Sequence, residues 1–277
     1  MADESNMGSN LLMPSADGLA LVVPGAHQSG ALMAFSLRGA DHASPPIGSL
    51  NFSMGAGDSR RSVERNFKLF AESLGIDSAS ILTCRQVHGD SVAVLNTVPD
   101  EPPRADAIIA PVPGLFPAIK TADCLPILMV DPVRKISAAV HAGWRGTVLR
   151  ITRKVLRMLV EKFAVDPGDL TVGLGPAIGP CCYEVDDAVL NPLREAIPDS
   201  DRFVRQLPSG RSSESKSQAS RRLDLAAVNL FELTSQGVAA EHIVSASLCT
   251  ACHPDLFFSH RRDGTPSGRH LSVVGIR

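Results

Sequence analysis

Short apolar segments separated by polar turns dominate the middle of the chain. Six of them lie between residues 81 and 141, and their sequences are ILTCRQV, SVAVL, DAIIA, FPAIKT, CLPILMV and KISAAVH. Three more follow at 169–175, 242–248 and 270–276. Segments of this length that are rich in β-branched residues and bounded by Gly, Pro or Asp are typical of strands. We therefore predict a β-strand in each of them.

Helical periodicity marks four other segments, at 58–74, 147–163, 186–196 and 223–236. In the first, Asp58 or Ser59 is placed to cap the start and Gly75 to end the helix. In the second, apolar residues recur at helical spacing opposite a charged face. Strands clustered in the middle, with helices inserted unevenly, predict an α+β fold: a single domain on a mixed β-sheet core with helices packed around it.

Two polar segments fall outside this pattern. Residues 1–20 predict a flexible N-terminal segment ahead of one catalytic domain at 21–277, and the Ser-rich stretch at 208–221 predicts a mobile loop. The start lacks the features of a signal peptide, and nowhere do about 18 apolar residues run together, so we expect a cytoplasmic protein without membrane association. A net charge of −2 argues against general affinity for nucleic acid.

Cysteine and histidine supply the candidate chemistry. The six cysteines are too few and too irregularly spaced for a disulfide scaffold, so in a reducing compartment they are thiols or metal ligands. His88, Cys124 and His141 each lie at the end of an apolar segment, where side chains of separate strands converge. Two imidazoles and a thiolate suit Zn²⁺, with a fourth position left for water or substrate. Taken singly, each is also an ordinary surface histidine or core cysteine, so spacing alone leaves both interpretations open.

Longer motifs add a family resemblance. They are RQVHGD (85–90), KTADCLPIL (120–128), VHAGWRG (140–146), GPAIGPCCYEV (175–185), and FFSHRRDG (257–264) followed by GRH (268–270). In this order they resemble the multicopper polyphenol oxidoreductase (laccase-domain) family, whose members are also described as YfiH-type purine nucleoside phosphorylases. The resemblance runs from about Phe35 to the C-terminus and implies a single α+β domain with a mixed sheet. It also implies that His88, Cys124 and His141 bind the metal, Zn²⁺ being expected and Cu²⁺ able to occupy the same site.

The resemblance also implies an activity. Its expected reactions are phosphorolysis of adenosine, inosine and S-methyl-5'-thioadenosine to base and sugar phosphate, and deamination of adenosine to inosine. The partners would be small purine nucleosides and phosphate, handled by a monomer or homodimer. The metal would contribute Lewis-acid chemistry.

Further residues near these motifs are candidates for catalysis and binding. Asp123, beside the catalytic candidate Cys124, is placed to orient a ligand or accept a proton, although in an extended strand the two side chains would point to opposite faces. Trp144 can stack on a base, or it is simply a core tryptophan. Guanidinium groups match phosphate with paired hydrogen bonds, although surface arginines are commoner than ligand-binding ones. The arginine candidates are Arg145, also considered catalytic, and Arg38, Arg261 and Arg262.

Three other functions compete with this interpretation. A copper-dependent polyphenol oxidase would use the same ligands, with Met129 as a weak axial sulfur, but eight histidines without a His-x-His pair are few for several coppers. A thiol hydrolase, such as a peptidoglycan-precursor editing amidase, would use Cys124 as its nucleophile. A noncatalytic zinc site could combine the CTACH segment at 249–253 with Cys181 or Cys182. A single C-x-x-C is a weak signal for that, and we expect these thiols near the active-site rim.

Overall fold

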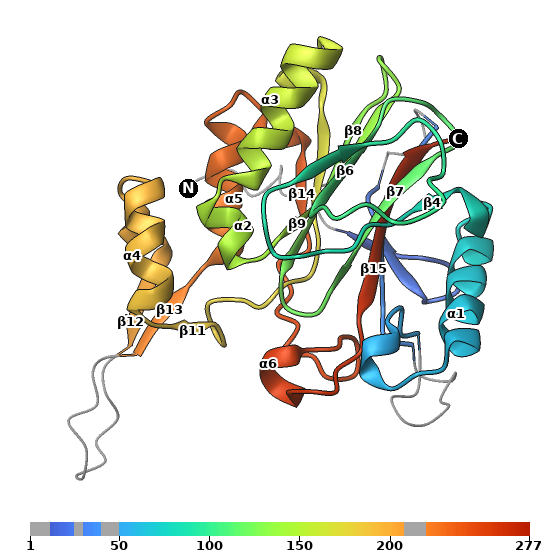
Figure 1. Ribbon diagram of the computed structural model, residues 1–277. Coiled ribbons are helices and arrows are strands. Elements are labelled where there is room, and N and C mark those ends of the chain that lie inside the picture. Colours follow the sequence, from blue (N-terminus) through green and yellow to red (C-terminus); the bar gives the residue numbers. More distant parts are fainter. Residues whose placement is uncertain (1–11, 25–29, 40–49, 208–219) are drawn as a thin grey trace, which may run out of the picture.

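Two six-stranded β-sheets form the centre of the computed structural model, which describes residues 12–24, 30–39, 50–207 and 220–277 (Figure 1). In order across the first sheet, the strands are β1 (Met13–Pro14), β2 (Ala20–Val22), β3 (Ala31–Ser36), β15 (His270–Ile276), β7 (Phe116–Thr121) and β4 (Ile81–Leu82). In order across the second, they are β14 (Ile243–Ser245), β10 (Thr171–Leu174), β8 (Leu125–Asp131), β9 (Ile136–Ala142), β6 (Ala107–Ala110) and β5 (Val92–Val94). Each sheet mixes parallel and antiparallel pairs, so the predicted α+β fold is confirmed, with two mixed sheets in place of one.

Three apolar clusters define the layers. One joins the two sheets through residues such as Phe35 and Leu128. The second packs the outer face of the first sheet against α1 (Arg60–Ser73), and the third packs the second sheet against α3 (Ile151–Phe163) and α5 (Leu225–Thr234). Figure 1 shows α1 on one side of the sheets and α3 and α5 on the other. Strands β8 and β9 are buried along their whole length because they lie inside this stack.

The helix predicted over 147–163 is divided in two. Helix α2 spans Trp144–Val148, and Arg150, in the left-handed region with a φ of 59°, separates it from α3. The Arg150 guanidinium donates hydrogen bonds of 2.8 and 3.1 Å to the buried carboxylate of Glu232, which ties the break to α5. The sequence pattern missed the break because helical spacing of apolar residues does not report the backbone angle of one residue.

Two polar segments singled out from the sequence border on described strands. Residues 13–14, inside the predicted N-terminal segment 1–20, and residues 20–22 at its end form strands of the first sheet, whereas residues 1–11 lie outside the described residues. Residues 208–219 of the predicted loop also lie outside them, whereas Ser220–Leu223 form β13 of a small third sheet with β11 (Glu184–Val185) and β12 (Val204–Leu207).

Short helices complete the chain. They are α4 (Asp187–Ala196), α6 (His260–Asp263) and the 3-10 turns η3 (Met54–Ala56), η4 (Ser78–Ser80), η5 (Pro167–Asp169), η6 (Ser200–Phe203) and η7 (Ala240–His242). No helix of the described segments has the length and apolarity that crossing a membrane requires.

His270, the first residue of β15, gives the stability of the protein a defined pH dependence. Its ring is buried, its Nε2 accepts a 2.7 Å hydrogen bond from the Phe258 N–H, and burial lowers its pKa from 6.5 to about 3. The unfolded chain takes up the proton below about pH 6.5 while the folded protein resists it, so stability falls as pH falls through this window. We expect His270→Gln to reduce the slope of unfolding free energy against pH by about 1.4 kcal/mol per pH unit, measured by urea denaturation between about pH 4 and pH 6. His242→Gln, at an exposed histidine, is the control; equal slopes for the two variants would contradict this account.

Candidate metal centre

Three segment ends bring His88, Cys124 and His141 together. His141 lies near the end of β9, Cys124 directly precedes β8, and His88 lies in the turn before β5. Because β8 and β9 are antiparallel, with Leu125 opposite Ala142, Cys124 falls beside the end of β9. The three potential donor atoms all lie within 4.8 Å of one another. This donor set fits Zn²⁺, which binds imidazole and thiolate and keeps an open position when three protein ligands hold it.

Asp106 organises both histidines. Its buried carboxylate lies 2.8 Å from His141 Nδ1 and accepts hydrogen bonds from the backbone N–H groups of Val87, His88 and Gly89 at 3.2, 2.9 and 2.8 Å. Burial acts to raise the pKa of Asp106, but the hydrogen bonds from His141 and Gly89 hold it below its usual value. With Nδ1 of His141 engaged by the carboxylate, Nε2 is the ring nitrogen left for a metal.

The surroundings of the Cys124 thiol favour the loss of its proton. Burial opposes ionisation, yet the charges and hydrogen bonds of His141 and His88 lower the pKa of Cys124 to about 6. Burial acts to lower the pKa of His141, whereas the neighbouring Cys124 and Asp106 raise it to about 9. The thiolate is the form that binds metal and the form that acts as a nucleophile.

Gly143 provides the space that the sulfur occupies. A Cβ atom at this position would lie 2.9 Å from Cys124 Sγ and 3.7 Å from His88 Cδ2. A Cβ at Gly146 would lie 3.1 Å from the Gly89 carbonyl oxygen. The two glycines therefore let the start of α2 approach the ligand cluster closely.

A cavity of about 900 Å³ opens over the three candidate ligands. Its size is suited to a small organic molecule. Its lining combines aromatic rings with several charged side chains, and these residues are Trp144, Tyr183, Arg85, Lys120, Glu184, Asp186, Arg261 and Arg269. Besides the three potential ligands, the lining residues predicted from the sequence are Asp123, Trp144 and Arg261.

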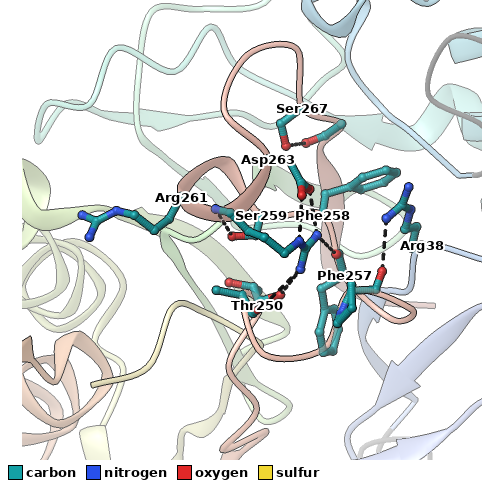
Figure 2. Close-up of polar contacts among 12 residues, drawn as sticks. Arg38, Thr250, Phe257, Phe258, Ser259, Arg261, Asp263 and Ser267 are labelled. Carbon is teal, nitrogen blue, oxygen red and sulfur yellow. Dashed lines mark hydrogen bonds and ion pairs between the residues drawn. The ribbon is translucent and has the colours of Figure 1, made fainter. Parts of the chain in front are cut away.

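Other predicted residues are placed differently. Arg38, Arg145 and Arg262 are not among the described residues that line the cavity. The guanidinium of Arg145 lies over the ring of Trp144, 4.4 Å from its centroid, so Arg145 packs against a residue of the cavity lining. Arg38 donates a 3.1 Å hydrogen bond to the carbonyl of Pro254 (Figure 2).

Arg262 holds a loop together. Its guanidinium donates hydrogen bonds of 2.9 Å to the carbonyls of Thr250 and Phe257 and pairs with Asp263 at 2.7 Å. All three nitrogens of its guanidinium thus donate within the protein. Figure 2 shows the side chain of Arg261 extending away from this group, consistent with its position on the cavity lining.

Asp123 anchors the loop that contains Cys124. Its φ is 86° and β8 begins at Leu125, so Asp123 and Cys124 do not lie in an extended strand, the condition under which their side chains would point to opposite faces. One carboxylate oxygen accepts a 2.6 Å hydrogen bond from the Thr250 hydroxyl, and the other accepts one of 2.6 Å from the Arg261 N–H. Asp123 thus ties the cavity wall to two distant segments.

Three residues of the site, Asp106, Lys120 and Arg269, are not predicted from the sequence. Asp106 begins the apolar strand segment DAIIA, and an acidic residue opening a fully buried strand is the signal that could have identified it. Lys120 and Arg269 lie within the family-like motifs, but nothing in their spacing shows that β7 and β15 are neighbours.

Comparison with known proteins identifies the family. Residues 32–277 match the model of the family described as multi-copper polyphenol oxidoreductase laccase. Purine nucleoside phosphorylase YlmD of Geobacillus stearothermophilus is 34% identical over 259 residues, which cover 90% of this chain and 91% of that protein. Adenosine deaminase RL5, from an unknown prokaryotic organism, is 34% identical over 219 residues, covering 74% and 78%. The crystal structure of Bacillus licheniformis hypothetical protein YfiH matches with a TM-score of 0.83 and 30% identity, covering 96% of this chain and 97% of that one.

These matches and the arrangement of the site define an α+β enzyme with a cavity above a cluster of potential metal ligands. The chain belongs to the multi-copper polyphenol oxidoreductase laccase family, to which its motifs are similar.

Proposed function

We propose that this protein is a Zn²⁺-dependent cytoplasmic enzyme of purine nucleosides. It would convert adenosine, inosine or S-methyl-5'-thioadenosine and phosphate to the base and ribose 1-phosphate or its methylthio derivative, and would deaminate adenosine to inosine. The observation that carries the proposal is that His88, Cys124 and His141 line one cavity together with aromatic and cationic side chains. Relatives named purine nucleoside phosphorylase and adenosine deaminase support the substrate class.

In this proposal His88, Cys124 and His141 hold the metal, and Asp106 keeps the His141 ring oriented. Bound Zn²⁺ supplies Lewis-acid chemistry. Trp144 and Tyr183 present rings to the cavity for stacking on a purine. The side chains of the protein thereby position the base while the cationic lining receives phosphate.

Lys120, Arg261 and Arg269 are the proposed phosphate-binding groups. Burial lowers the pKa of Lys120 and that of Arg269, and the nearby guanidinium of Arg269 lowers the pKa of Lys120 further. No ion pair between any of these three side chains and a carboxylate occurs in the described part of the chain. Lys120 and Arg269 are half-buried and Arg261 is exposed. Neighbouring cations that are partly removed from water favour a bound anion, which offsets their repulsion.

Replacement of Lys120 by methionine should separate the two reactions. A charge-assisted hydrogen bond contributes about 1.5–3 kcal/mol, so we expect the KM for phosphate in phosphorolysis to rise by roughly 10- to 100-fold. Deamination, which consumes water instead of phosphate, should change far less. Lys68→Met, at an exposed lysine on α1, is the control; a Lys120 variant with an unchanged phosphate KM would remove this residue from the phosphate site.

Product analysis tests the activity itself. Zn²⁺-loaded protein is incubated with adenosine, with and without phosphate, and the products are separated by chromatography. Adenine that appears only with phosphate supports phosphorolysis, and inosine formed without phosphate supports deamination. Absence of all three products, adenine, inosine and hypoxanthine, with Zn²⁺ still bound would reject the proposal.

A thiol hydrolase, such as a peptidoglycan-precursor editing amidase, is the second candidate, because Cys124 lies beside two imidazoles that could accept its proton. Chelation separates the candidates, since a nucleophilic thiol keeps its activity without metal. A copper-dependent polyphenol oxidase is less well supported. Among the described residues, His88, Cys124 and His141 form the single group of potential ligands that contains imidazole, whereas oxygen reduction by a laccase uses several coppers.

A further inference from the structure

A second group of potential ligands lies outside the cluster of His88, Cys124 and His141. Cys181 and Cys182 occupy the loop between β10 and β11, and Cys249 and Cys252 follow β14. The four sulfur atoms all lie within 4.8 Å of one another, and Cys252 Sγ is 3.4 Å from the sulfurs of both Cys181 and Cys182. All four are free thiols.

The spacing of these sulfurs matches a tetrahedral metal site. Zinc–sulfur bonds of about 2.3 Å place neighbouring sulfurs of a tetrahedron about 3.8 Å apart. A pair of disulfides would instead give two separate contacts of about 2.05 Å. Here the sulfur of Cys252 is close to two others at the same distance, as in a cluster arranged around one centre.

We propose that Cys181, Cys182, Cys249 and Cys252 bind one Zn²⁺ as a structural site, separate from the candidate catalytic centre. Four thiolates complete the tetrahedral coordination of Zn²⁺ and leave no position for substrate. Thiolate sulfur selects Zn²⁺ over the harder divalent cations.

Backbone groups around the four cysteines support sulfur atoms in the thiolate form. The Gly179 N–H donates a 3.3 Å hydrogen bond to Cys249 Sγ, a contact that disperses negative charge from a metal-bound sulfur. The N–H of Cys252 donates to the Cys249 carbonyl at 3.2 Å and closes the turn that directs both side chains to one point. A Cβ on Gly179 would lie 3.3 Å from Cys249 Cβ, so glycine eases the close approach of the two cysteine segments.

Two arginines lie next to the four cysteines. The guanidinium of Arg262 donates to the carbonyls of Thr250 and Ala251, the two residues between Cys249 and Cys252. The guanidinium of Arg222 donates to the carbonyl of Cys181. Four thiolates and one Zn²⁺ carry a formal charge of −2; the cation of Arg222 offsets part of it, whereas the charge of Arg262 is shared with Asp263.

The bound metal would fasten the wall of the active-site cavity. The segment that carries Cys181 and Cys182 continues into Tyr183 and Glu184, which line the cavity. On the other segment, the Thr250 hydroxyl donates to Asp123, the neighbour of Cys124. Zn²⁺ would therefore cross-link two segments that are 71 positions apart and that both border the site.

Metal stoichiometry tests the proposal. After loading with Zn²⁺ and dialysis, elemental analysis should find two Zn²⁺ per wild-type chain and one in each of Cys252→Ser and Cys124→Ala. The double variant should hold none. Cys84→Ala removes a thiol that belongs to neither group, and it should keep both ions. One Zn²⁺ per wild-type chain, retained by Cys252→Ser, would overturn the second site.

Cobalt substitution tests the same site without altering it. In Cys124→Ala the first centre has no sulfur, so sulfur-to-cobalt charge-transfer absorption on adding Co²⁺ arises from the four-cysteine cluster. We expect this absorption together with the visible bands of tetrahedral Co²⁺, and its loss on adding one equivalent of Zn²⁺. Reduced Cys124→Ala protein that shows no such absorption would contradict the proposal, even if Cys252→Ser failed to fold.

Discussion

Replacing Cys124 by alanine is expected to lower kcat/KM for nucleoside phosphorolysis by more than about 100-fold and to remove one bound Zn²⁺. Cys124 supplies the thiolate among three donors that lie within 4.8 Å of one another, and without it two imidazoles remain. Loss of a direct ligand should exceed the 10- to 100-fold cost typical of removing a group that only supports a ligand. Steady-state kinetics and elemental analysis of the same preparation measure both effects.

Cys84→Ala is the matched control for this change. Cys84 is buried, whereas Cys124 is half-buried, and both line the cavity; burial raises the pKa of the Cys84 thiol to about 12. Its removal should leave the first Zn²⁺ in place. A Cys124→Ala protein that loses the metal and still turns over nucleosides would contradict a metal-dependent mechanism. Retention of the metal with loss of activity would instead favour Cys124 as a nucleophile.

The three candidate ligands lie close together because strand ends meet in space. The antiparallel pairing of β8 and β9 places Cys124 beside the end of the strand that carries His141. The fold class could be predicted for a related reason, since alternating short apolar segments report burial in a sheet. The division of those segments into two stacked sheets could not, because β3 and β15 pair across more than 230 positions.

Contacts between residues that are far apart in the sequence could not be predicted. Asp106 contacts His141 from 35 positions away, and periodicity carries no information on such a pair. Arg262 shows the opposite case, since an arginine in a motif predicts a ligand while its donors are used by Thr250, Phe257 and Asp263. Charge alone in a sequence does not show which partners a side chain already has.

The four clustered cysteines could not be predicted to form one group from their spacing in the sequence, because the fold brings them together. A single C-x-x-C at 249–252 is a poor indicator of zinc, and its partners Cys181 and Cys182 are adjacent instead of forming a second C-x-x-C. The parallel bridge between Ala177 and Cys249 brings the two segments together. Four sulfurs within 4.8 Å then become a ligand set that spacing could not reveal.

Replacing Asp106 by alanine is expected to weaken Zn²⁺ binding by about 10- to 100-fold although Asp106 is not a ligand. The substitution removes the acceptor of three backbone N–H groups around His88 and the partner of His141 Nδ1, so two of the three ligands lose their orientation. Asp106→Asn should fall between alanine and the wild type, because its amide oxygen still accepts from the backbone while its NH₂ group cannot. Competition with a chromophoric chelator measures the affinity in the Cys252→Ser background, where the second proposed site is disabled.

Asp131→Asn distinguishes this positioning role from general destabilisation. Asp131 is buried like Asp106 and accepts hydrogen bonds from the backbone N–H groups of Val133 and Arg134, but it lies at the end of β8 far from Cys124. Its replacement should lower the free energy of unfolding and leave the Zn²⁺ affinity unchanged. If Asp106→Asn and Asp131→Asn lowered the affinity equally, the effect would come from the stability of the second sheet. A loss of affinity confined to Asp106 would instead place the carboxylate within the metal centre as the group that orients its histidines.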